Sequence, residues 1–238
     1  MRTFGLIGKN LSHSFSAGYF NEKFNKEEIK DAVYKNFELS NISEFSDLIQ
    51  NNHLLGLNVT IPYKESVIPF LDELTPQAKA IGAVNTIQFK DNKLIGHNTD
   101  TIGFSQSISP ILKGRNKALV LGNGGAAKAI IYALETLNIE HKTVNRNSSF
   151  NYLDVNSETI GYYDIIINTT PLGTHPKTAE FPQIPYANLN DIHLLFDLIY
   201  NPTESTFLRF GKKQNCNIKN GLEMLQIQAE ASWNIWNS

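Results

Sequence analysis

Hydrophobic and polar positions follow two different patterns along this chain. Short apolar runs rich in β-branched residues are separated by segments in which apolar side chains recur at helical spacing, a pattern typical of a layered α/β fold. Before residue 98 the expected strands are 3–7, 32–37, 56–60, 84–89 and 93–96. Residues 18–24 and 42–50 are the expected helices of this part, and Asp91-Asn92 predicts a hairpin turn between the last two strands.

After residue 100 the apolar runs become shorter and more uniform, as in the buried strands of a parallel sheet. The expected strands are 117–121, 139–144, 163–167 and 193–198. An alanine-rich helix follows the first of them to about residue 137, and an amphipathic helix spans 222–236. Between 146 and 164 there is little helical periodicity, so one crossover helix is expected to be shortened or missing. The change of pattern predicts a domain boundary near 98–100.

Composition and charge narrow the class of protein. The 238 residues are enough for one or two domains, each with its own core. With 21 basic and 23 acidic side chains the net charge is −2, which gives no indication of a nucleic-acid or membrane-surface partner. No apolar run reaches the roughly 20 residues that span a bilayer. We therefore expect a cytoplasmic enzyme.

Cysteine and histidine usage argues against a metal site. The single cysteine, Cys216, cannot form an internal disulfide, fits a reducing compartment and is expected to be a buried apolar residue. The six histidines include no His-x-x-x-His pair and no Cys/His cluster. The sequence therefore predicts no bound metal.

A glycine-rich turn lies between the strand 117–121 and the alanine-rich helix. Gly122-x-Gly124-x-x-Ala127 matches the dinucleotide-binding fingerprint with alanine at the last position. Gly122 permits the tight turn, Gly124 lets the backbone approach a pyrophosphate, and Ala127 keeps the helix close to the sheet. The backbone N–H groups and the helix dipole would then bind the phosphates. The alternative is a glycine turn without a ligand.

The strand that follows this helix ends in Asn145-Arg146. In an NAD site, an acidic residue at this position accepts hydrogen bonds from the ribose 2′-hydroxyl, whereas an arginine pairs with the 2′-phosphate of NADP. The alternative for Arg146 is a solvated surface charge. Because the glycine turn precedes it, we predict NADP(H) as the cofactor.

Three earlier segments carry polar residues where predicted strands end. Ser14 and Ser16 follow the first strand, and their hydroxyl and backbone N–H groups could bind a carboxylate or cap a helix. Lys64 follows the strand 56–60, and taken alone it is more often a solvated lysine than a catalyst. Asp100 follows the strand 93–96 and is a candidate helix N-cap, a candidate catalytic partner, or both.

In their order and spacing, these segments resemble the shikimate dehydrogenase family from Gly8 to Gln228. The resemblance covers nearly the whole chain and is specific because it rests on many segments together. They are Ser-His-Ser-Phe-Ser at 12–16, Asn-Val-Thr-Ile-Pro-Tyr-Lys at 58–64, Gly-Ala-Val-Asn-Thr at 82–86, Gly-His-Asn-Thr-Asp at 96–100, Gly-Asn-Gly-Gly-Ala at 122–126, Asn-Arg at 145–146, Asn-Thr-Thr-Pro-Leu-Gly at 168–173, Asp-Leu-Ile-Tyr-Asn-Pro at 197–202, and Gly-Leu-Glu-Met-Leu at 221–225 followed by Gln228.

The resemblance implies reversible NADPH-dependent reduction of 3-dehydroshikimate to shikimate, a step in aromatic amino acid biosynthesis through chorismate. It implies that Lys64 and Asp100 are the catalytic proton-transfer pair. The substrate-binding residues that it implies are Ser14, Ser16, Thr60, Asn85, Tyr200 and Gln228. The cofactor-binding residues that it implies are Gly122, Asn123, Gly124, Gly125, Ala126, Asn145, Arg146, Thr169 and Gly221.

The implied architecture is α/β with two domains and a cleft between them. Residues 1–99 plus 220–238 would form a substrate-binding domain with a mixed sheet, and residues 100–219 a Rossmann-type NADP-binding domain. The implied partners are small molecules, shikimate and 3-dehydroshikimate, with no nucleic acid and no membrane. Monomer and homodimer both remain open.

The chain departs from the usual pattern of the family at four positions. Asn10 and Ala17 stand where proline is usual, Asn147 stands where the cofactor segment usually has threonine, and Phe150 stands near the usual place of a second basic residue. The preference for NADP is therefore expected to be weaker than usual. Two other functions stay open: a quinate/shikimate dehydrogenase that uses NAD or both cofactors, and a catalytically silent NADP-binding regulatory protein.

Two further pairs of residues carry motif-like spacing. Tyr19-x-x-x-Lys23 has the spacing of the catalytic pair of short-chain dehydrogenases, but it precedes the glycine turn instead of following it, so we expect one face of an ordinary helix. Trp233 and Trp236, three residues apart, are expected to pack from the last helix onto a core.

Overall fold

The computed structural model describes residues 1–12 and 14–238, which divide into two compact units. The first unit is 1–99 with 229–238, and the second is 100–228. The chain thus passes from one unit to the other at the predicted boundary and again inside its last helix, α9 (Leu222–Trp236). We expected all of 220–238 in the first unit. The early part of α9 belongs to the second because Met224 is buried in its core.

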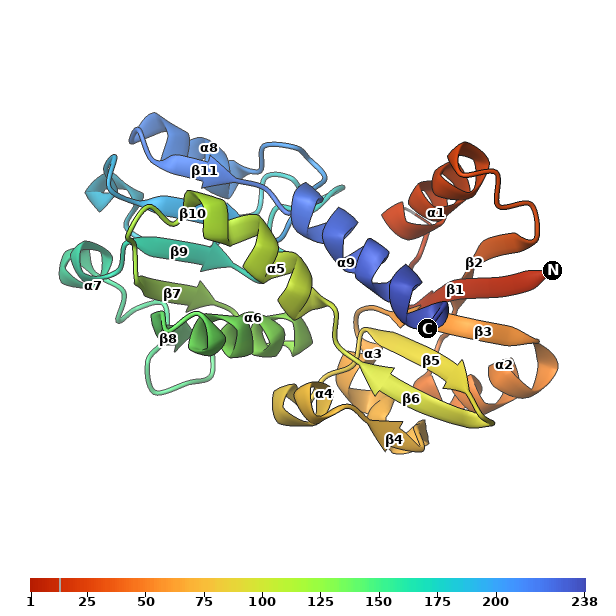
Figure 1. Cartoon of the computed structure of the whole chain (residues 1–238). Coiled ribbons are helices and arrows are strands. Elements are labelled where there is room, and N and C mark those ends of the chain that lie inside the picture. The colour runs from red at the N-terminus through yellow and green to blue at the C-terminus, as the bar shows by residue number, and fades with distance from the viewer. Residues whose placement is uncertain (13) are drawn as a thin grey trace. The chain divides into compact units, whose positions relative to one another are not determined.

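The first unit contains a mixed sheet, as expected, with six strands where the sequence predicted five (Figure 1). Its strands are β1 (Arg2–Gly8), β2 (Ala32–Glu38), β3 (Leu54–Val59), β4 (Glu73–Leu74), β5 (Thr86–Lys90) and β6 (Lys93–His97). The strand order is β2-β1-β3-β5-β6-β4. The β1 strand is parallel to β2 and β3, whereas β5 is antiparallel to both of its neighbours.

The hairpin between β5 and β6 forms at the predicted turn. Asp91 and Asn92 both adopt positive φ angles, 51° and 59°, which are the conformations of a tight two-residue hairpin turn. Asn and Asp tolerate this backbone region better than other non-glycine residues. The turn fixes the pairing of the two strands and therefore the edge at which β6 ends.

Helices cover both faces of this sheet. They are α1 (Phe15–Lys26), α2 (Phe45–Asn51), α3 (Tyr63–Ser66) and α4 (Pro76–Ile81). The core on one face includes Phe45 of α2, Tyr63 of α3 and Ala78 of α4. The core on the other face joins α1 to the last turns of α9.

The two tryptophans of α9 pack on this second face, which confirms the expectation. Trp236 stacks on Phe4 with ring centroids 5.1 Å apart, and its indole N–H donates to the carbonyl oxygen of Ile87 at 3.0 Å. A Cβ atom on Gly56 would lie 2.3 Å from the Trp236 ring, so only glycine lets the helix come this close to β3. Trp233 packs edge-on against Phe4.

The second unit contains a five-stranded parallel sheet of Rossmann type. Its strands are β7 (Lys117–Leu121), β8 (Glu140–Val144), β9 (Ile165–Asn168), β10 (Leu194–Asp197) and β11 (Asn217–Lys219). The order is β11-β10-β9-β7-β8, so the chain moves first to one side of β7 and then to the other. Ligands of such sheets bind outside the carboxyl ends of the strands, where this reversal occurs.

The helices of the second unit are α5 (Asp100–Ile108), α6 (Gly125–Thr136), α7 (Ser157–Tyr162) and α8 (Thr206–Lys213). The core on one face of the sheet joins α5 and α6, and the core on the other face joins α7 and α8. The crossover helix α7 has only 6 residues, which confirms the expected shortening. Cys216 is buried in the second of these cores, as predicted, and burial raises the pKa of its thiol to about 11.

The described part of the chain lacks two features. Within 1–12 and 14–238 there is no helix that is both long enough and apolar enough to cross a bilayer. The same residues contain no group of three or more His, Cys, Asp or Glu side chains that could hold a metal ion.

Candidate functional site

One edge of the first unit's sheet gathers most of the predicted substrate-binding residues. The strands β1, β3 and β6 end at this edge, and the antiparallel β5 begins there. Ser14 and Ser16 follow β1, Thr60 and Lys64 follow β3, and Asn85 directly precedes β5. The strand pairing therefore brings these five residues to the same edge.

Backbone contacts hold these segments together. The N–H of Thr60 donates to the carbonyl oxygen of Ile7 at 2.9 Å, and the N–H of Val84 donates to that of Lys64 at 2.7 Å. A Cβ atom on Gly8 would lie 2.5 Å from the methyl group of Thr60, so the end of β1 is packed tightly against the end of β3. The ends of β1 and β3 are thus neighbours, and so are the segments that carry Lys64 and Asn85.

The two serines occupy different environments at the start of α1. Ser14 is the N-cap residue, yet within the described part of the chain its side chain makes no capping hydrogen bond. The alternative that Ser14 serves to cap the helix is therefore not supported. Ser16 is buried, and its side chain lies within hydrogen-bonding reach of the phenol of Tyr34 on β2.

The side chain of Asn85 forms hydrogen bonds to Thr99, the residue that precedes Asp100. The backbone N–H of Thr99 donates to Oδ1 of Asn85 at 2.7 Å, and Nδ2 of Asn85 donates to Oγ1 of Thr99 at 3.0 Å. Both side chains are buried. The Asn85 amide therefore fixes the orientation of the chain where it leaves the first unit.

The structure places the predicted catalytic residues in different units. Lys64 is half-buried in α3 of the first unit. Asp100 is the first residue of α5 in the second unit and is buried, so its carboxylate lies in the first turn of a helix, where the helix dipole favours a negative charge. That Lys64 and Asp100 act on one substrate remains a prediction.

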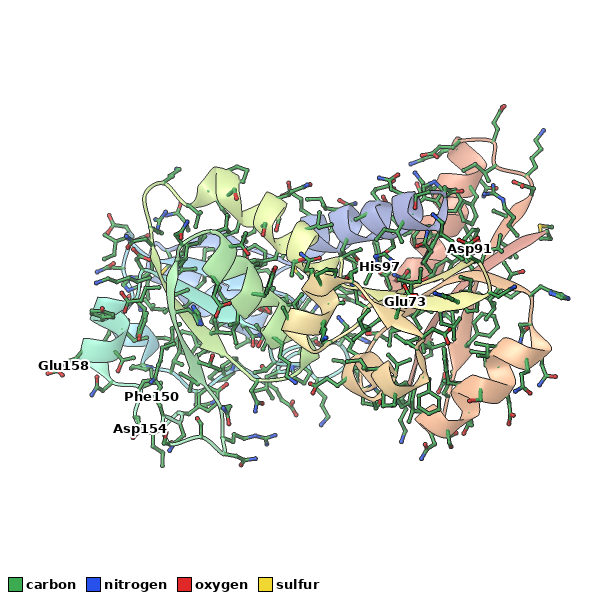
Figure 2. The ribbon with its side chains drawn as sticks, turned by 60° about the horizontal axis from the view of Figure 1, so that its bottom comes forward. Glu73, Asp91, His97, Phe150, Asp154 and Glu158 are labelled. Carbon is green, nitrogen blue, oxygen red and sulfur yellow. The ribbon has the colours of Figure 1, made fainter. Side chains whose placement is uncertain are left out.

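The residues between β6 and Asp100 are also buried. Asn98 donates from Nδ2 to the carbonyl oxygen of Ala83 at 2.9 Å. His97, labelled in Figure 2, ends β6, and its Nε2 atom is buried without a hydrogen-bond partner among residues 1–12 and 14–238. Burial lowers the pKa of His97, which favours the neutral imidazole.

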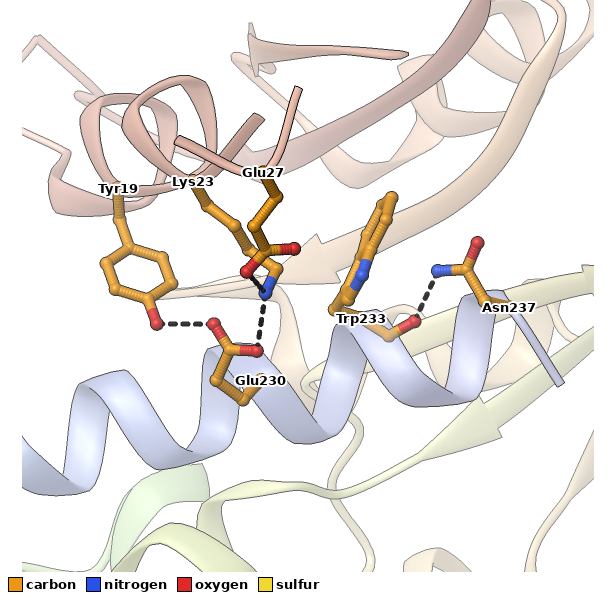
Figure 3. A network of polar contacts seen from close by, with 6 residues as sticks. All are labelled: Tyr19, Lys23, Glu27, Glu230, Trp233 and Asn237. Atoms are coloured by element: carbon orange, nitrogen blue, oxygen red, sulfur yellow. Dashed lines mark hydrogen bonds and ion pairs between the residues drawn. The ribbon is translucent and has the colours of Figure 1, made fainter. Parts of the chain in front are cut away.

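Tyr19 and Lys23 lie on one face of α1, as predicted, and both contact Glu230 of α9 (Figure 3). The phenol of Tyr19 donates to one carboxylate oxygen at 2.5 Å, and the ammonium of Lys23 contacts the other at 2.8 Å. Lys23 also contacts Glu27 at 2.6 Å. The pair therefore has a structural role in joining α1 to α9.

The glycine turn of the second unit has the geometry that a dinucleotide requires. Gly122 has a φ of 115°, and a Cβ atom there would lie 2.5 Å from Oγ1 of Thr169. Gly124 is the N-cap of α6, and apart from its own chain neighbours no residue of 1–12 and 14–238 has a heavy atom within 4 Å of the position where its Cβ would be. The α6 helix thus begins beside open space, which leaves room for a phosphate group at its amide N–H groups.

The other predicted cofactor residues lie at the same edge of this sheet. Arg146 follows β8, and Thr169 follows β9 and donates from Oγ1 to the carbonyl oxygen of Leu121 at 2.7 Å. Gly221 precedes α9, and a Cβ atom there would lie 2.1 Å from the carbonyl oxygen of Leu198. That these residues bind the cofactor remains a prediction.

The loop after β8 is held by its own polar groups. Oδ1 of Asn145 accepts from the backbone N–H of Asn147 at 3.0 Å, and Arg146 is exposed. Phe150, labelled in Figure 2, packs against the core of the second unit. Phe150 carries no charge, so Arg146 is the basic residue that the Asn-Arg segment after β8 offers to a phosphate.

Asp197 organises two of the loops at this edge. It is completely buried at the end of β10, and its carboxylate accepts from the Asn168 amide, the Ile199 backbone N–H and the Ser205 hydroxyl at 3.0, 3.0 and 2.5 Å. Asn168 ends β9 and precedes Thr169, and Ile199 precedes Tyr200. Burial raises the pKa of Asp197 to about 6, although these hydrogen bonds lower it.

Comparison with known proteins identifies the family. Residues 6–87 match the family model described as the shikimate dehydrogenase substrate binding domain. The chain is 41% identical to the shikimate dehydrogenase (NADP(+)) of Clostridium beijerinckii, over 99% of this chain and 92% of that protein. This chain belongs to the shikimate dehydrogenase family.

Solved structures of shikimate dehydrogenases have the same fold. Shikimate dehydrogenase 1 of Peptoclostridium difficile is 37% identical, with a TM-score of 0.87 over 100% of this chain and 92% of that one. The shikimate 5-dehydrogenase of Thermus thermophilus, in complex with NADP(H) and shikimate, is 27% identical, with a TM-score of 0.89 over 99% of this chain and 93% of that one.

Sequence analysis missed three buried polar residues behind the site of this shikimate dehydrogenase family member. Tyr34 contacts Ser16, Ser232 contacts the segment around Asn85, and Asp197 holds the loops that carry Thr169 and Tyr200. For two of them, Asp197 and Ser232, the sequence contained a feature that could have indicated their role. Asp197 puts a charge at the end of an apolar run, and Ser232 lies on the apolar face of α9 between Ala229 and Trp236.

Proposed function

We propose that this chain catalyses the reversible NADPH-dependent reduction of 3-dehydroshikimate to shikimate in aromatic amino acid biosynthesis. The observation that carries the proposal is that Lys64 and Asp100 are both present within their family segments, each at the end of a strand-to-helix connection. The relatives support it because curated members with 41% and 37% identity are named shikimate dehydrogenase (NADP(+)).

The first unit is the proposed place of substrate binding. Ser14 and Ser16 would hold the substrate carboxylate with hydroxyl and backbone N–H groups. Thr60 and Asn85 would bind ring hydroxyls. From the rest of the chain, Gln228 would add a further polar contact and Tyr200 would lie beside the ring.

The second unit is the proposed place of NADP(H) binding. Gly122, Asn123, Gly124, Gly125 and Ala126 would bind the pyrophosphate through their backbone and the start of α6. Asn145 and Arg146 would contact the adenosine ribose and its 2′-phosphate, and Thr169 and Gly221 would line the remaining part. The bound NADPH supplies the hydride.

Lys64 and Asp100 are the proposed proton-transfer pair. Reduction of a ketone leaves negative charge on the carbonyl oxygen, and an ammonium group next to this oxygen stabilises the charge and then donates a proton. In the oxidation direction the same lysine would accept the proton from the substrate hydroxyl. Asp100 would orient the lysine and the hydroxyl by accepting hydrogen bonds.

Two further properties are part of the proposal. We place the protein in the cytoplasm because the pathway substrates and NADPH are small soluble metabolites. We expect it to act as a monomer or a homodimer, without a nucleic-acid or membrane partner. Size-exclusion chromatography with light scattering would distinguish the two oligomeric states.

Steady-state kinetics test the proposal. We expect oxidation of shikimate with NADP⁺ by the purified chain, and we expect Lys64→Ala to lower kcat by about 10²- to 10⁴-fold. Lys79→Ala is the matched control because Lys79 is an exposed lysine on α4 of the same unit, and its kcat should stay unchanged. An unchanged kcat for Lys64→Ala would remove Lys64 from the mechanism.

A quinate/shikimate dehydrogenase that uses NAD is the second candidate, and the observation that favours it is Phe150. Packed against the core near the usual place of a second basic residue, it offers no charge to a 2′-phosphate. The loss of one charge-assisted contact is worth about one to two decades in affinity. Rates with shikimate and quinate, each with NAD⁺ and NADP⁺, separate the two candidates, and a preference for quinate and NAD⁺ would favour the second. No turnover with any pair would favour a regulatory protein.

A further inference from the structure

The buried carboxylate of Asp197 lies between two segments that carry predicted cofactor-binding residues of the second unit. Asp197 ends β10, the strand between β9 and β11. Its Oδ1 atom accepts from Nδ2 of Asn168 and from the backbone N–H of Ile199, both at 3.0 Å, and its Oδ2 atom accepts from the hydroxyl of Ser205. A buried carboxylate with three donors holds them in one arrangement, because each alternative leaves a polar group unpaired.

Asn168 connects this carboxylate to Thr169. A backbone N–H can only donate, so the Asn168 amide atom that contacts the N–H of Thr170 at 3.0 Å is Oδ1. The hydroxyl of Thr170 donates to the same Oδ1 at 2.7 Å. Nδ2 is therefore the atom that faces Asp197, and the Asn168 side chain closes a turn around Thr169.

Thr169 in turn packs against the glycine turn. Its backbone N–H and its hydroxyl both donate to the carbonyl oxygen of Leu121, at 2.9 and 2.7 Å. A Cβ atom on Gly122 would lie 2.5 Å from Oγ1 of Thr169. A shift of Thr169 would therefore change the space beside Gly122, where the predicted pyrophosphate site begins.

Ile199 connects the same carboxylate oxygen to Gly221. The N–H of Ile199 donates to Oδ1 of Asp197, and its carbonyl oxygen accepts from the N–H of Gly221 at 3.0 Å. Gly221 also packs on the carbonyl oxygen of Leu198, which would lie 2.1 Å from a Cβ atom at this position. Oδ1 of Asp197 is thus joined to Gly221 through Ile199, as it is joined to Thr169 through Asn168.

We infer that Asp197 is a positioning residue for NADP(H): through Asn168 and Ile199 it fixes Thr169 and Gly221 relative to each other, so that both can contact one bound cofactor. The inference rests on the proposed function, which assigns Thr169 and Gly221 to the cofactor. It adds a residue that is in neither predicted set of binding residues and that acts on cofactor affinity through its two neighbours.

Asn168→Ala and Ser205→Ala form a matched pair for the test. Each substitution removes one hydrogen bond to Asp197 from a side chain that is at most 1% exposed. Asn168 precedes Thr169, whereas Ser205 is the N-cap of α8, which carries no predicted site residue. Both variants should lose stability, and the loss of cofactor affinity should be confined to Asn168→Ala.

Steady-state kinetics with shikimate and NADP⁺, together with a titration that follows the fluorescence of NADPH, measure the effect. We expect Asn168→Ala to raise the KM for NADP⁺ and the Kd for NADPH about five- to twentyfold, within the value of one hydrogen bond to a charged group. Ser205→Ala should change both less than about twofold. An equal change in the two variants would overturn the inference.

Two further readouts distinguish positioning from a general disturbance of the second unit. Asn168→Ala should change the KM for shikimate less than about twofold, because the N–H of Ile199, which precedes Tyr200, keeps its acceptor. Asp197→Asn should keep the Kd for NADPH within about twofold, because its amide oxygen still accepts from Asn168 and Ile199. A loss of NADPH affinity in Asp197→Asn as large as that in Asn168→Ala would contradict the positioning role.

Thr170→Val supplies the test if Asn168→Ala does not fold. Valine keeps the shape of threonine and removes the hydroxyl that donates to Oδ1 of Asn168. We expect the Kd for NADPH to rise about two- to threefold, and Thr170→Ser should restore the value of the unsubstituted protein. An unchanged Kd in Thr170→Val would overturn the inference.

The outcomes also separate this inference from the proposed function. Normal shikimate oxidation by the unsubstituted protein, with an unchanged KM for NADP⁺ in Asn168→Ala, would overturn the positioning role alone. If the unsubstituted protein binds NADPH without oxidising shikimate, the proposed reaction fails, and the Kd values of the same variants still decide the positioning role. No binding of NADPH by the unsubstituted protein would overturn both.

Discussion

The buried polar groups behind the sheet edges differ in kind between the two units. In the first unit, hydroxyl and amide groups of Tyr34, Asn58, Thr86 and Ser232 bond to one another without any charge. In the second unit, the single carboxylate of Asp197 accepts hydrogen bonds from three segments of the chain. Both arrangements orient loops that carry predicted site residues.

The difference has a physical consequence for how each unit responds to pH. Neutral hydroxyl and amide groups do not titrate near neutrality, and burial raises the pKa of Tyr34 further, so the first network keeps its protons. A buried carboxylate loses its solvation, and the pKa of Asp197 is raised to about 6. We therefore expect loop positioning to be independent of pH in the first unit and sensitive to it in the second.

Asp197→Ala should have the largest effect on stability. The substitution leaves the Asn168 amide, the Ile199 N–H and the Ser205 hydroxyl without their acceptor, at a cost of about 3–5 kcal/mol in the free energy of unfolding. Asp197→Asn is the control because its amide oxygen still accepts and its nitrogen can donate to Ser205, so it should cost less than about 1 kcal/mol. Urea unfolding at pH 7 measures both. Equal costs would show that the carboxylate does not hold these loops.

The next largest expected effect is the change of stability with pH. Because the pKa of Asp197 rises from 3.8 to about 6 on folding, the folded chain binds this proton more tightly than the unfolded chain. The contribution of this bound proton to the free energy of unfolding is then fully present below pH 3.8. It is lost as the pH rises through 6, which lowers the free energy of unfolding by about 3 kcal/mol. The comparison is the unfolding free energy of the unsubstituted protein minus that of Asp197→Asn between pH 4 and 7. A difference that is flat over this range would contradict the expectation.

Tyr34→Phe should have a smaller and pH-independent effect. The substitution leaves Oδ1 of Asn58 without the phenol donor, at a cost of about 1–2 kcal/mol. Since no group of this network titrates near neutrality, the cost should be the same at pH 5 and pH 8 in urea unfolding. A cost that changes across this range would remove the contrast between the two units.

Glu230→Gln should have the smallest effect. Lys23 is 10% exposed but Glu230 is 40% exposed, so water screens the pair and its loss should cost about 0.5–1 kcal/mol. The cost should shrink as salt is added. Glu22→Gln is the control. It removes the exposed Glu22–Lys26 pair within α1, the helix that carries Lys23, and should leave the thermal midpoint unchanged. An equal loss for both variants would show that the contact between α1 and α9 adds nothing.

The sequence predicted the parts of the fold in which local pattern and tertiary structure agree. The hairpin at Asp91-Asn92, the glycine turn before α6 and the shortened α7 follow from residues that are adjacent in the chain. The short elements β4, α4, α8 and β11 were missed. The two strands span 2 and 3 residues, too few for a periodic pattern to appear, and the two helices span 6 and 8 residues.

The site was predicted as a set of family residues, and the supporting contacts were not. Asn58 and Thr86 lie in quoted family segments, but no spacing rule shows that both meet Ser232, which is more than 140 residues away along the chain. Hydrogen bonds of this kind depend on how a helix from the end of the chain packs on a sheet from its beginning. Only the fold reveals them.

The last ten residues matter for the order in which the chain can mature on the ribosome. Residues 1–99 emerge first, yet one face of their sheet is covered by Ala229 and Trp236, which emerge after the entire second unit. Until then the aromatic surface around Phe4 and Phe20 lacks its partner. The half of the protein that is synthesised first is thus the half that is finished last, and its nascent form is the one that needs protection from aggregation.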